Sequence, residues 1–199
     1  LAESYELGTW DNPDTGEVAT EMNFTLRSDP PPLWHDGDPV TPEDVKFSMD
    51  FAKACGAGVC FYYPSVQNIH SVDIIDGKIR VRMGLFSIWA PQWVGDLPIL
   101  KQDLWGNIED ATGKTWTDEG FDFQAVRNYD PMVDDADEDG TEDLKQDGTG
   151  AWIFVDYELG TYISYVANDN YYISQAEVDD ALERMFHGEG DVDYDTAVG

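Results

Sequence analysis

The chain has 199 residues, 42% of them hydrophobic and 13% aromatic, which is enough to bury a packed core. It carries 41 acidic against 11 basic residues, a formal net charge of −30. Such a chain repels nucleic acid phosphates and anionic lipid surfaces, which excludes nucleic acid as a general partner. The acid is spread along the whole sequence, as on a surface that holds water and cations in high salt, so we expect a halophilic, haloarchaeal origin.

The first predicted element is a half-buried strand over residues 21–28. Apolar residues alternate there with polar neighbours, which is the period of a strand with one face on a core: Met22, Phe24 and Leu26. A run of prolines and Gly37 then breaks regular structure, so we expect a turn before the next element.

A helix is predicted over residues 42–54. Thr41 has a side chain preferred at a helix N-cap, and Pro42 suits the first helical position because the N–H it lacks would be unsatisfied there. Apolar residues then recur at helical spacing. We expect Trp34 to fill the core beneath this helix.

The dipeptide His35–Asp36 precedes the helix and has two interpretations. It could be the acid–base pair of a hydrolase, or part of a turn whose side chains bond to local backbone groups. A catalytic triad also needs a nucleophile and an oxyanion site, and no candidate nucleophile is near in sequence. The pattern favours the turn. Because His70 and His187 are not grouped with a nucleophile either, we predict no catalytic residue and no enzyme activity.

Cys55 and Cys60 enclose two glycines, which let the chain curl enough to bring the sulfurs together. An oxidising compartment favours a small disulfide between them, and a reducing one favours a pair of thiols. A metal site is disfavoured, because a lone cysteine pair supplies too few ligands.

A β-hairpin is predicted over residues 71–85, with Asp76–Gly77 as its turn. Lys78, Arg80 and Arg82 fall on one face of the second strand. These cations could bind an anion, but pairing with acidic neighbours on adjacent strands is the commoner arrangement.

Trp89 and Trp93 follow this hairpin and are four residues apart in a segment with prolines. Spaced tryptophans can stack on a ligand, so both are candidate ligand-binding residues. The alternative is that they act as an apolar wedge beneath a crossover.

The remaining chain begins with a polar region over residues 107–148. Two further strands are predicted over residues 150–158 and 160–169 as an antiparallel pair, followed by a helix over residues 175–186.

An acidic segment inside the polar region matches the start of a calcium loop, D-x-D-x-D-G. Its candidate ligands are Asp135, Asp137, Asp139 and the carbonyl of Thr141. Position twelve of the pattern is Gln146 and not the usual glutamate. Calcium is therefore weighed against a plain acidic surface insertion, and no cofactor is expected to be required.

Several blocks of the sequence, in order, resemble the peptide/nickel group of extracellular solute-binding proteins, family 5. They read "LAESYEL", "LWHDGDPVTPEDVKFSMDFAK", "SVDIIDGKIRVRM", "DGTGAWIFVDYELGTYISYVANDNYY" and "ALERMFHGEGDVDY". The resemblance is close over residues 1–172 and looser in the tail. It implies an α/β (mixed α+β) chain that forms part of a type II periplasmic-binding-protein-like fold, with antiparallel hairpins and a few helices.

The resemblance also implies an order of domains. Residues 1–106 resemble the small accessory domain, residues 107–172 part of the first ligand-binding lobe, and residues 173–199 the beginning of the second lobe. The family's opening strand and most of its second lobe have no counterpart here, so we expect a fragment of a longer chain.

The function implied is that of the substrate-binding component of an ABC importer. It would capture oligopeptides or dipeptides outside the cell and deliver them to the membrane permease, as a monomer held at the cell surface by a lipid anchor. Tyr62 and Tyr63 fall where family members can place a tyrosine toward the cleft, with plain packing as the alternative. The alternative function is a calcium-stabilised extracellular module of a halophile without a transport role.

Overall fold

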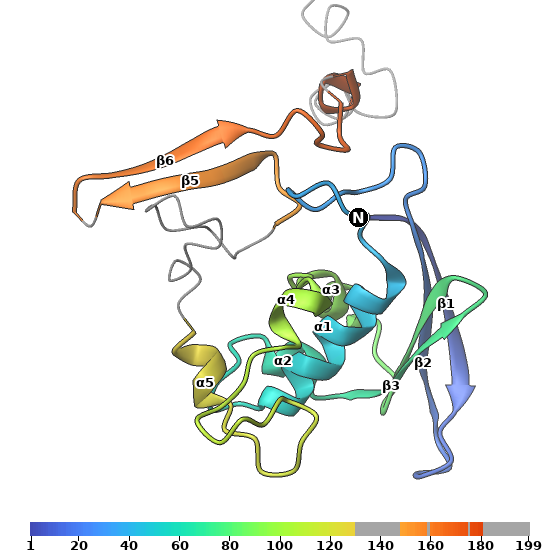
Figure 1. The fold of residues 1–199 in the computed structure, drawn as a ribbon. Helices are drawn as coiled ribbons and strands as arrows, with labels where there is room; N and C mark the ends of the chain where they lie inside the picture. Colours follow the sequence, from blue (N-terminus) through green and yellow to red (C-terminus); the bar gives the residue numbers. More distant parts are fainter. Residues whose placement is uncertain (130–147, 159, 175, 181–199) are drawn as a thin grey trace, which may run out of the picture.

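The computed structural model describes residues 1–129, 148–158, 160–174 and 176–180. Its first sheet has four antiparallel strands in the order β1–β2–β4–β3. These strands are β1 (Ala2–Asp11), β2 (Val18–Leu26), β3 (Ile69–Ile75) and β4 (Lys78–Met83). Helix α1 (Pro42–Cys55) lies against one face of the sheet, which gives a mixed α+β arrangement of two layers (Figure 1).

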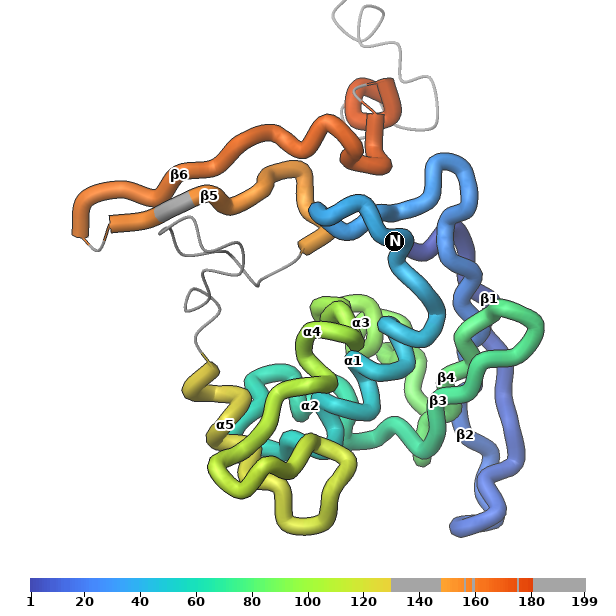
Figure 2. Tube along the Cα trace, viewed as in Figure 1, coloured from blue at the N-terminus to red at the C-terminus, as the bar shows by residue number. Residues whose placement is uncertain are grey.

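The other elements of the described fold are α2 (Tyr63–Val66), α3 (Ala90–Gly95), α4 (Gln102–Trp105), α5 (Gln124–Arg127), β5 (Trp152–Glu158) and β6 (Tyr162–Ala167). Helices α2 and α4 contact α1, and α3 contacts α2 (Figure 2). Strands β5 and β6 form a separate two-stranded antiparallel sheet. Among the described residues, no helix has the length and apolar character needed to cross a membrane.

The hydrophobic core lies between the sheet and α1. Val45, Met49 and Ala52 point from one side of the helix into a buried cluster with sheet residues such as Met22 and Ile79. Burying a valine, methionine or isoleucine side chain stabilises the fold by about 1.5–3 kcal/mol. The helical spacing seen in the sequence therefore identified the face of α1 that meets the sheet.

The start of α1 confirms the predicted N-cap. The Thr41 side chain accepts a hydrogen bond from the Asp44 backbone N–H at 3.2 Å, and the Asp44 carboxylate accepts one from the Thr41 N–H at 2.9 Å. This reciprocal pair is a capping box. Trp34 is only 2% exposed, which confirms its predicted place in the core.

The other side of α1 carries an aromatic cluster. Phe47 and Phe51 meet the ring of Trp116 edge-on at 5.5 and 5.6 Å, and Phe123 lies 6.0 Å from Phe51. Helix α1 therefore packs against the sheet on one side and against residues beyond 106 on the other. The predicted domain boundary at residue 106 stays a prediction.

The predicted hairpin is formed by β3 and β4. Asp76 and Gly77 both have positive φ angles, 52° and 76°, as a tight two-residue turn requires. The cations of β4 pair with acidic side chains: Lys78 with Glu6 at 3.6 Å, Arg80 with Asp73 at 3.0 Å and Arg82 with Glu21 at 2.7 Å. The interpretation as ion pairs is confirmed for all three.

The strand predicted over residues 21–28 is β2, which begins earlier, at Val18, because β1 pairs with it from that residue onward. β1 itself was not predicted. The predicted strands over residues 150–158 and 160–169 are confirmed as β5 and β6. The described part of the last predicted helix, residues 176–180, is helical, and the rest of it lies outside the described residues.

Candidate ligand-binding surface

The four aromatic residues predicted to bind a ligand lie on two neighbouring segments. Tyr62 and Tyr63 form the start of α2, and Trp89 and Trp93 belong to the N-cap and body of α3, the helix that contacts α2. The structure therefore places the two pairs on adjacent helices, although they are distant in sequence.

These aromatic residues differ in how far they are buried. Tyr62 and Trp93 are partly buried and pack against the core cluster, which is the role of a structural side chain. Trp89 is 64% exposed, and Phe61, beside Tyr62, is 88% exposed. Exposed aromatic rings of this size are available to stack on a ligand. Whether any of the four binds a ligand stays a prediction.

The hairpin of β5 and β6 presents a second aromatic surface, which the sequence pattern did not single out. Its large exposed side chains are Trp152, Val155, Tyr157, Tyr162, Ile163, Tyr165 and Val166. Successive residues of a strand point to opposite faces, so these side chains are divided between the two faces of the hairpin. A two-stranded sheet on its own is marginally stable in water. The aromatic residues on both strands were a signal for this surface in the sequence.

The turn at His35 contacts the segment before β5. The His35 backbone N–H donates to the Gly148 carbonyl at 2.8 Å, and its ring nitrogen Nε2 lies 3.1 Å from the Gly150 carbonyl oxygen. Asp36 accepts a hydrogen bond from the Asp38 N–H at 3.0 Å and pairs with Lys101. The dipeptide thus lies in a turn, as favoured from the sequence, but His35 bonds to backbone groups more than a hundred residues away and not to the local ones that were expected.

The fit at this junction predicts a specific effect of substitution. A Cβ atom added at Gly148 would lie 3.0 Å from His35 Cε1, whereas one added at Gly150 would meet nothing closer than 3.8 Å. Gly148→Ala is expected to weaken the contact between His35 and Gly148 by about 1 kcal/mol. The amide hydrogen of His35 should then exchange about fivefold faster. Gly150→Ala is the matched control, and equal exchange rates in both variants would contradict the tight contact.

A second tie connects the end of β2 with the C-terminal described helix. Arg27 Nη2 donates to the Glu177 carboxylate at 2.6 Å, and the Ser174 N–H donates to the same group at 2.8 Å. These hydrogen bonds, the one from the Ser174 backbone first, lower the pKa of Glu177 to about 2. The carboxylate is therefore ionised throughout the neutral range and the pair persists there.

Cys55 and Cys60 are free thiols in the structure, so the predicted disulfide is not formed in it. Cys55 closes α1, and the Cys60 N–H donates to the Gly56 carbonyl at 3.0 Å, so the chain does turn back as the glycines suggested. A disulfide under oxidising conditions stays a prediction.

The surroundings of Cys55 predict slow alkylation. Burial, and then the neighbouring Cys60, raise the pKa of the Cys55 thiol from 9.0 to about 11. Because the thiolate is the nucleophile, its fraction at pH 8 is about 100-fold lower than that of an unperturbed thiol, and the rate should rise about tenfold per pH unit up to pH 11. Iodoacetamide labelling of Cys55, followed by peptide mass spectrometry, measures this rate. A rate that levels off near pH 9 would contradict the shift.

The predicted calcium ligands Asp135, Asp137, Asp139 and Thr141 lie outside the described residues, so this site stays a prediction. Within the described part of the chain, no group of three or more histidine, cysteine or acidic side chains is placed to hold a metal ion.

Comparison with known proteins gives one family. The model of the bacterial extracellular solute-binding proteins, family 5, matches residues 1–194. No curated protein sequence matches the chain.

Several solved structures resemble the chain. AppA from Bacillus subtilis, an oligopeptide-binding protein in complex with a nonapeptide, has a TM-score of 0.58 and 16% identity over 86% of this chain and 28% of its own. NikZ from Campylobacter jejuni, in complex with Ni(L-His), has a TM-score of 0.54 and 18% identity over 96% of this chain and 37% of its own. A mannohexaose-bound oligopeptide-binding protein from Thermotoga maritima has a TM-score of 0.56 and 21% identity over 86% and 25% of the two chains. The chain thus spans only about a quarter to two fifths of the length of these proteins.

Proposed function

The chain belongs to the bacterial extracellular solute-binding proteins of family 5, and we propose that it is part of a receptor that captures oligopeptides or dipeptides outside the cell for the permease of an ABC importer. The observation that carries this proposal is the family match, which extends over residues 1–194. The fold class expected from the sequence is confirmed, because the mixed α+β chain resembles type II periplasmic-binding-protein folds. The proposed activity is binding without bond chemistry.

Peptide is the solute class we propose. The titles of the similar structures name a nonapeptide, a nickel–histidine complex and a hexasaccharide, each as the ligand of that protein. Support for peptide comes from the sequence blocks, which resemble the peptide/nickel group, and from exposed aromatic side chains that accept varied side chains by stacking, such as Trp89. Main-chain hydrogen bonds would hold the peptide backbone, so selectivity would be broad.

The proposed mechanism is closure of two lobes around the solute. Residues 1–106 would form the accessory domain, residues 107–172 part of the first lobe, and residues 173–199 the beginning of the second. Binding would shift the population from open to closed forms, because the solute contacts both lobes only in the closed one. The exposed aromatic faces of β5 and β6 are where we expect further parts of the receptor to pack. A lipid anchor at the cell surface and a monomeric state complete the proposal.

Native mass and peptide retention together test the proposal. The native protein from its own cells is expected to have a mass well above 22.3 kDa and to retain peptides through purification, which denaturation releases for mass spectrometry. As a control, the same preparation is incubated with an unrelated peptide library and then washed. Peptides from the library should then replace the retained ones. A native mass near 22.3 kDa together with no retained or exchangeable peptide would overturn the transport function.

A further inference from the structure

Two long runs of the sequence, residues 54–72 and 83–95, contain no aspartate, glutamate, lysine or arginine. They are the longest such runs in a chain of which 26% is charged. The runs lie side by side in the fold, because the Gly84 N–H donates to the Asn68 carbonyl at 2.7 Å and α2 contacts α3. Together they contain all four predicted ligand-binding residues: Tyr62, Tyr63, Trp89 and Trp93.

Large apolar side chains on these two runs are exposed to solvent. We call this set the uncharged surface: Phe61, Leu85, Phe86, Ile88 and Trp89. Ile88 is 70% exposed and Phe86 is 59% exposed. Apolar side chains that gather in one area mark interaction sites, and the centre of an interface is typically poor in charge and rich in aromatic rings. The uncharged surface has this composition.

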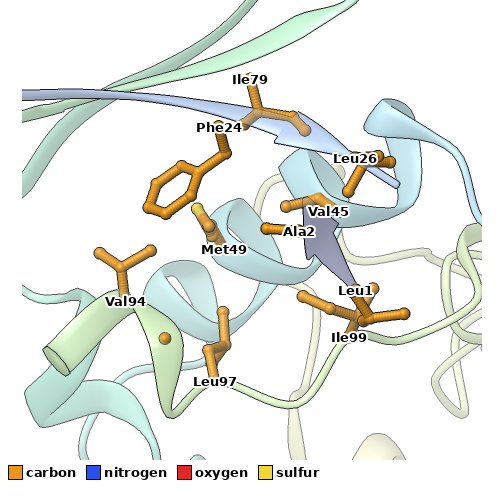
Figure 3. A pocket seen from close by; sticks show the side chains of 11 residues that line it. Leu1, Ala2, Phe24, Leu26, Val45, Met49, Ile79, Val94, Leu97 and Ile99 are labelled. Atoms are coloured by element: carbon orange, nitrogen blue, oxygen red, sulfur yellow. The ribbon is translucent and has the colours of Figure 1, made fainter. Parts of the chain in front are cut away.

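The backbone beneath the uncharged surface is held in place. The hydroxyl of Thr20, a residue only 1% exposed, accepts from the Ser87 N–H at 2.9 Å and donates to the Ser87 carbonyl at 3.1 Å. On the inner side, Val94 of α3 points toward Phe24 and Met49 in the core (Figure 3). The exposed side chains therefore project from a fixed support, which lowers the entropy lost when a ligand binds.

The absence of charge decides which peptides fit this surface. A terminal ammonium or carboxylate loses hydration when it is covered, and neither run contains a charged side chain to compensate. A dipeptide spans at most about 7 Å, so both of its charged termini would lie on the surface. A pentapeptide spans up to about 17 Å, so its central side chain can contact the surface while both termini lie outside it.

We propose that the uncharged surface binds apolar side chains from the interior of oligopeptides, and that dipeptides and peptides with charged central side chains are poor solutes. This inference rests on the proposed function, and it chooses between the two solute classes named there. The ligand side chain is held by stacking on Trp89 and by the removal of apolar surface from water.

Four defined peptides test this selectivity in the full-length protein, after denaturation and refolding have removed retained peptides. They are Ala-Ala-Phe-Ala-Ala, its counterparts with a central aspartate or lysine, and the dipeptide Ala-Phe. Calorimetric titration is done in 1 M KCl, where the screening length of about 3 Å removes long-range attraction by the net charge. The phenylalanine pentapeptide is expected to bind at least tenfold more tightly than each of the other three.

Two substitutions at exposed positions connect this selectivity to the uncharged surface. Ile88→Asp should weaken binding of the phenylalanine pentapeptide at least tenfold, whereas Ile75→Asp, the same change at an exposed isoleucine at the far end of β3, should not. Trp89→Ala should weaken binding of that peptide about fivefold and leave the aspartate pentapeptide unchanged. A purely structural role of Trp89 would change the affinity for both peptides alike.

The possible outcomes separate this inference from the proposed function. If the pentapeptides bind with equal affinity, or if Ile88→Asp and Ile75→Asp bind alike, the inference is wrong and the proposed function stands. If the lysine pentapeptide binds most tightly in 1 M KCl, acidic side chains and not the uncharged surface select the solute. If none of the four peptides binds the parent protein, both the inference and the proposed peptide function fail.

Discussion

Replacing Asp44 by Ala is expected to lower the free energy of unfolding by about 3 kcal/mol. Asp44 is 6% exposed, and its carboxylate accepts hydrogen bonds from three segments. The donors are the Thr41 N–H at 2.9 Å, the Thr41 hydroxyl at 2.8 Å, the Gln102 N–H at 2.9 Å and Trp34 Nε1 at 3.4 Å. Alanine leaves these donors without their acceptor and also removes the capping box of α1.

Thermal unfolding measures this loss against a control on the same helix. The expected fall in Tm for Asp44→Ala is about 10 °C. Asp50→Ala removes an aspartate that forms an exposed pair with Lys46, so it should cost no more than about 0.5 kcal/mol. Similar Tm values for the two variants would show that the Asp44 hydrogen bonds do not hold the turn, α1 and the α4 segment together.

Local sequence signals predicted the elements whose causes are local. The N-cap at Thr41 and the turn at Asp76–Gly77 are set by the residues that form them, and both were located correctly. β1 was missed because it is an edge strand whose side chains are almost all exposed, so its apolar alternation does not mark a buried face. The packing of Trp116 on Phe47 is equally invisible in the sequence, because it joins residues about seventy apart through the tertiary fold.

The candidate ligand surface was predictable only in part. Spacing drew attention to Trp89 and Trp93, but it could not tell which of them is buried, and only Trp89 proved largely exposed. The docking of His35 on Gly148 depends on two segments more than a hundred residues apart, and a single glycine carries no signal of its partner. The proposed function likewise comes from the family resemblance and not from residue patterns alone.

The fold is also expected to gain stability as salt rises. Two like charges 10 Å apart repel by about 0.4 kcal/mol in water, which one Debye length of screening at 0.1 M salt reduces to about 0.15 kcal/mol. With 41 acidic residues against 11 basic ones, dozens of such pairs sum to several kcal/mol. The ion pairs on β4, such as Arg82–Glu21, are partly exposed and weaken with salt, but each contributes at most about 1 kcal/mol. Repulsion therefore dominates the salt response.

Melting in a KCl series tests this balance. Tm is expected to rise by about 10 °C between 0.1 and 1 M KCl and then to level off, because the Debye length has fallen to about 3 Å and little repulsion remains to be screened. Sucrose at matched osmolality is the control, because a solute that is excluded from the protein surface raises Tm without a plateau. A Tm that falls with KCl would mean that the screening of ion pairs outweighs the screening of repulsion between acidic side chains. A Tm that climbs steadily past 1 M would mean that exclusion of the salt from the protein surface, and not charge screening, stabilises the fold.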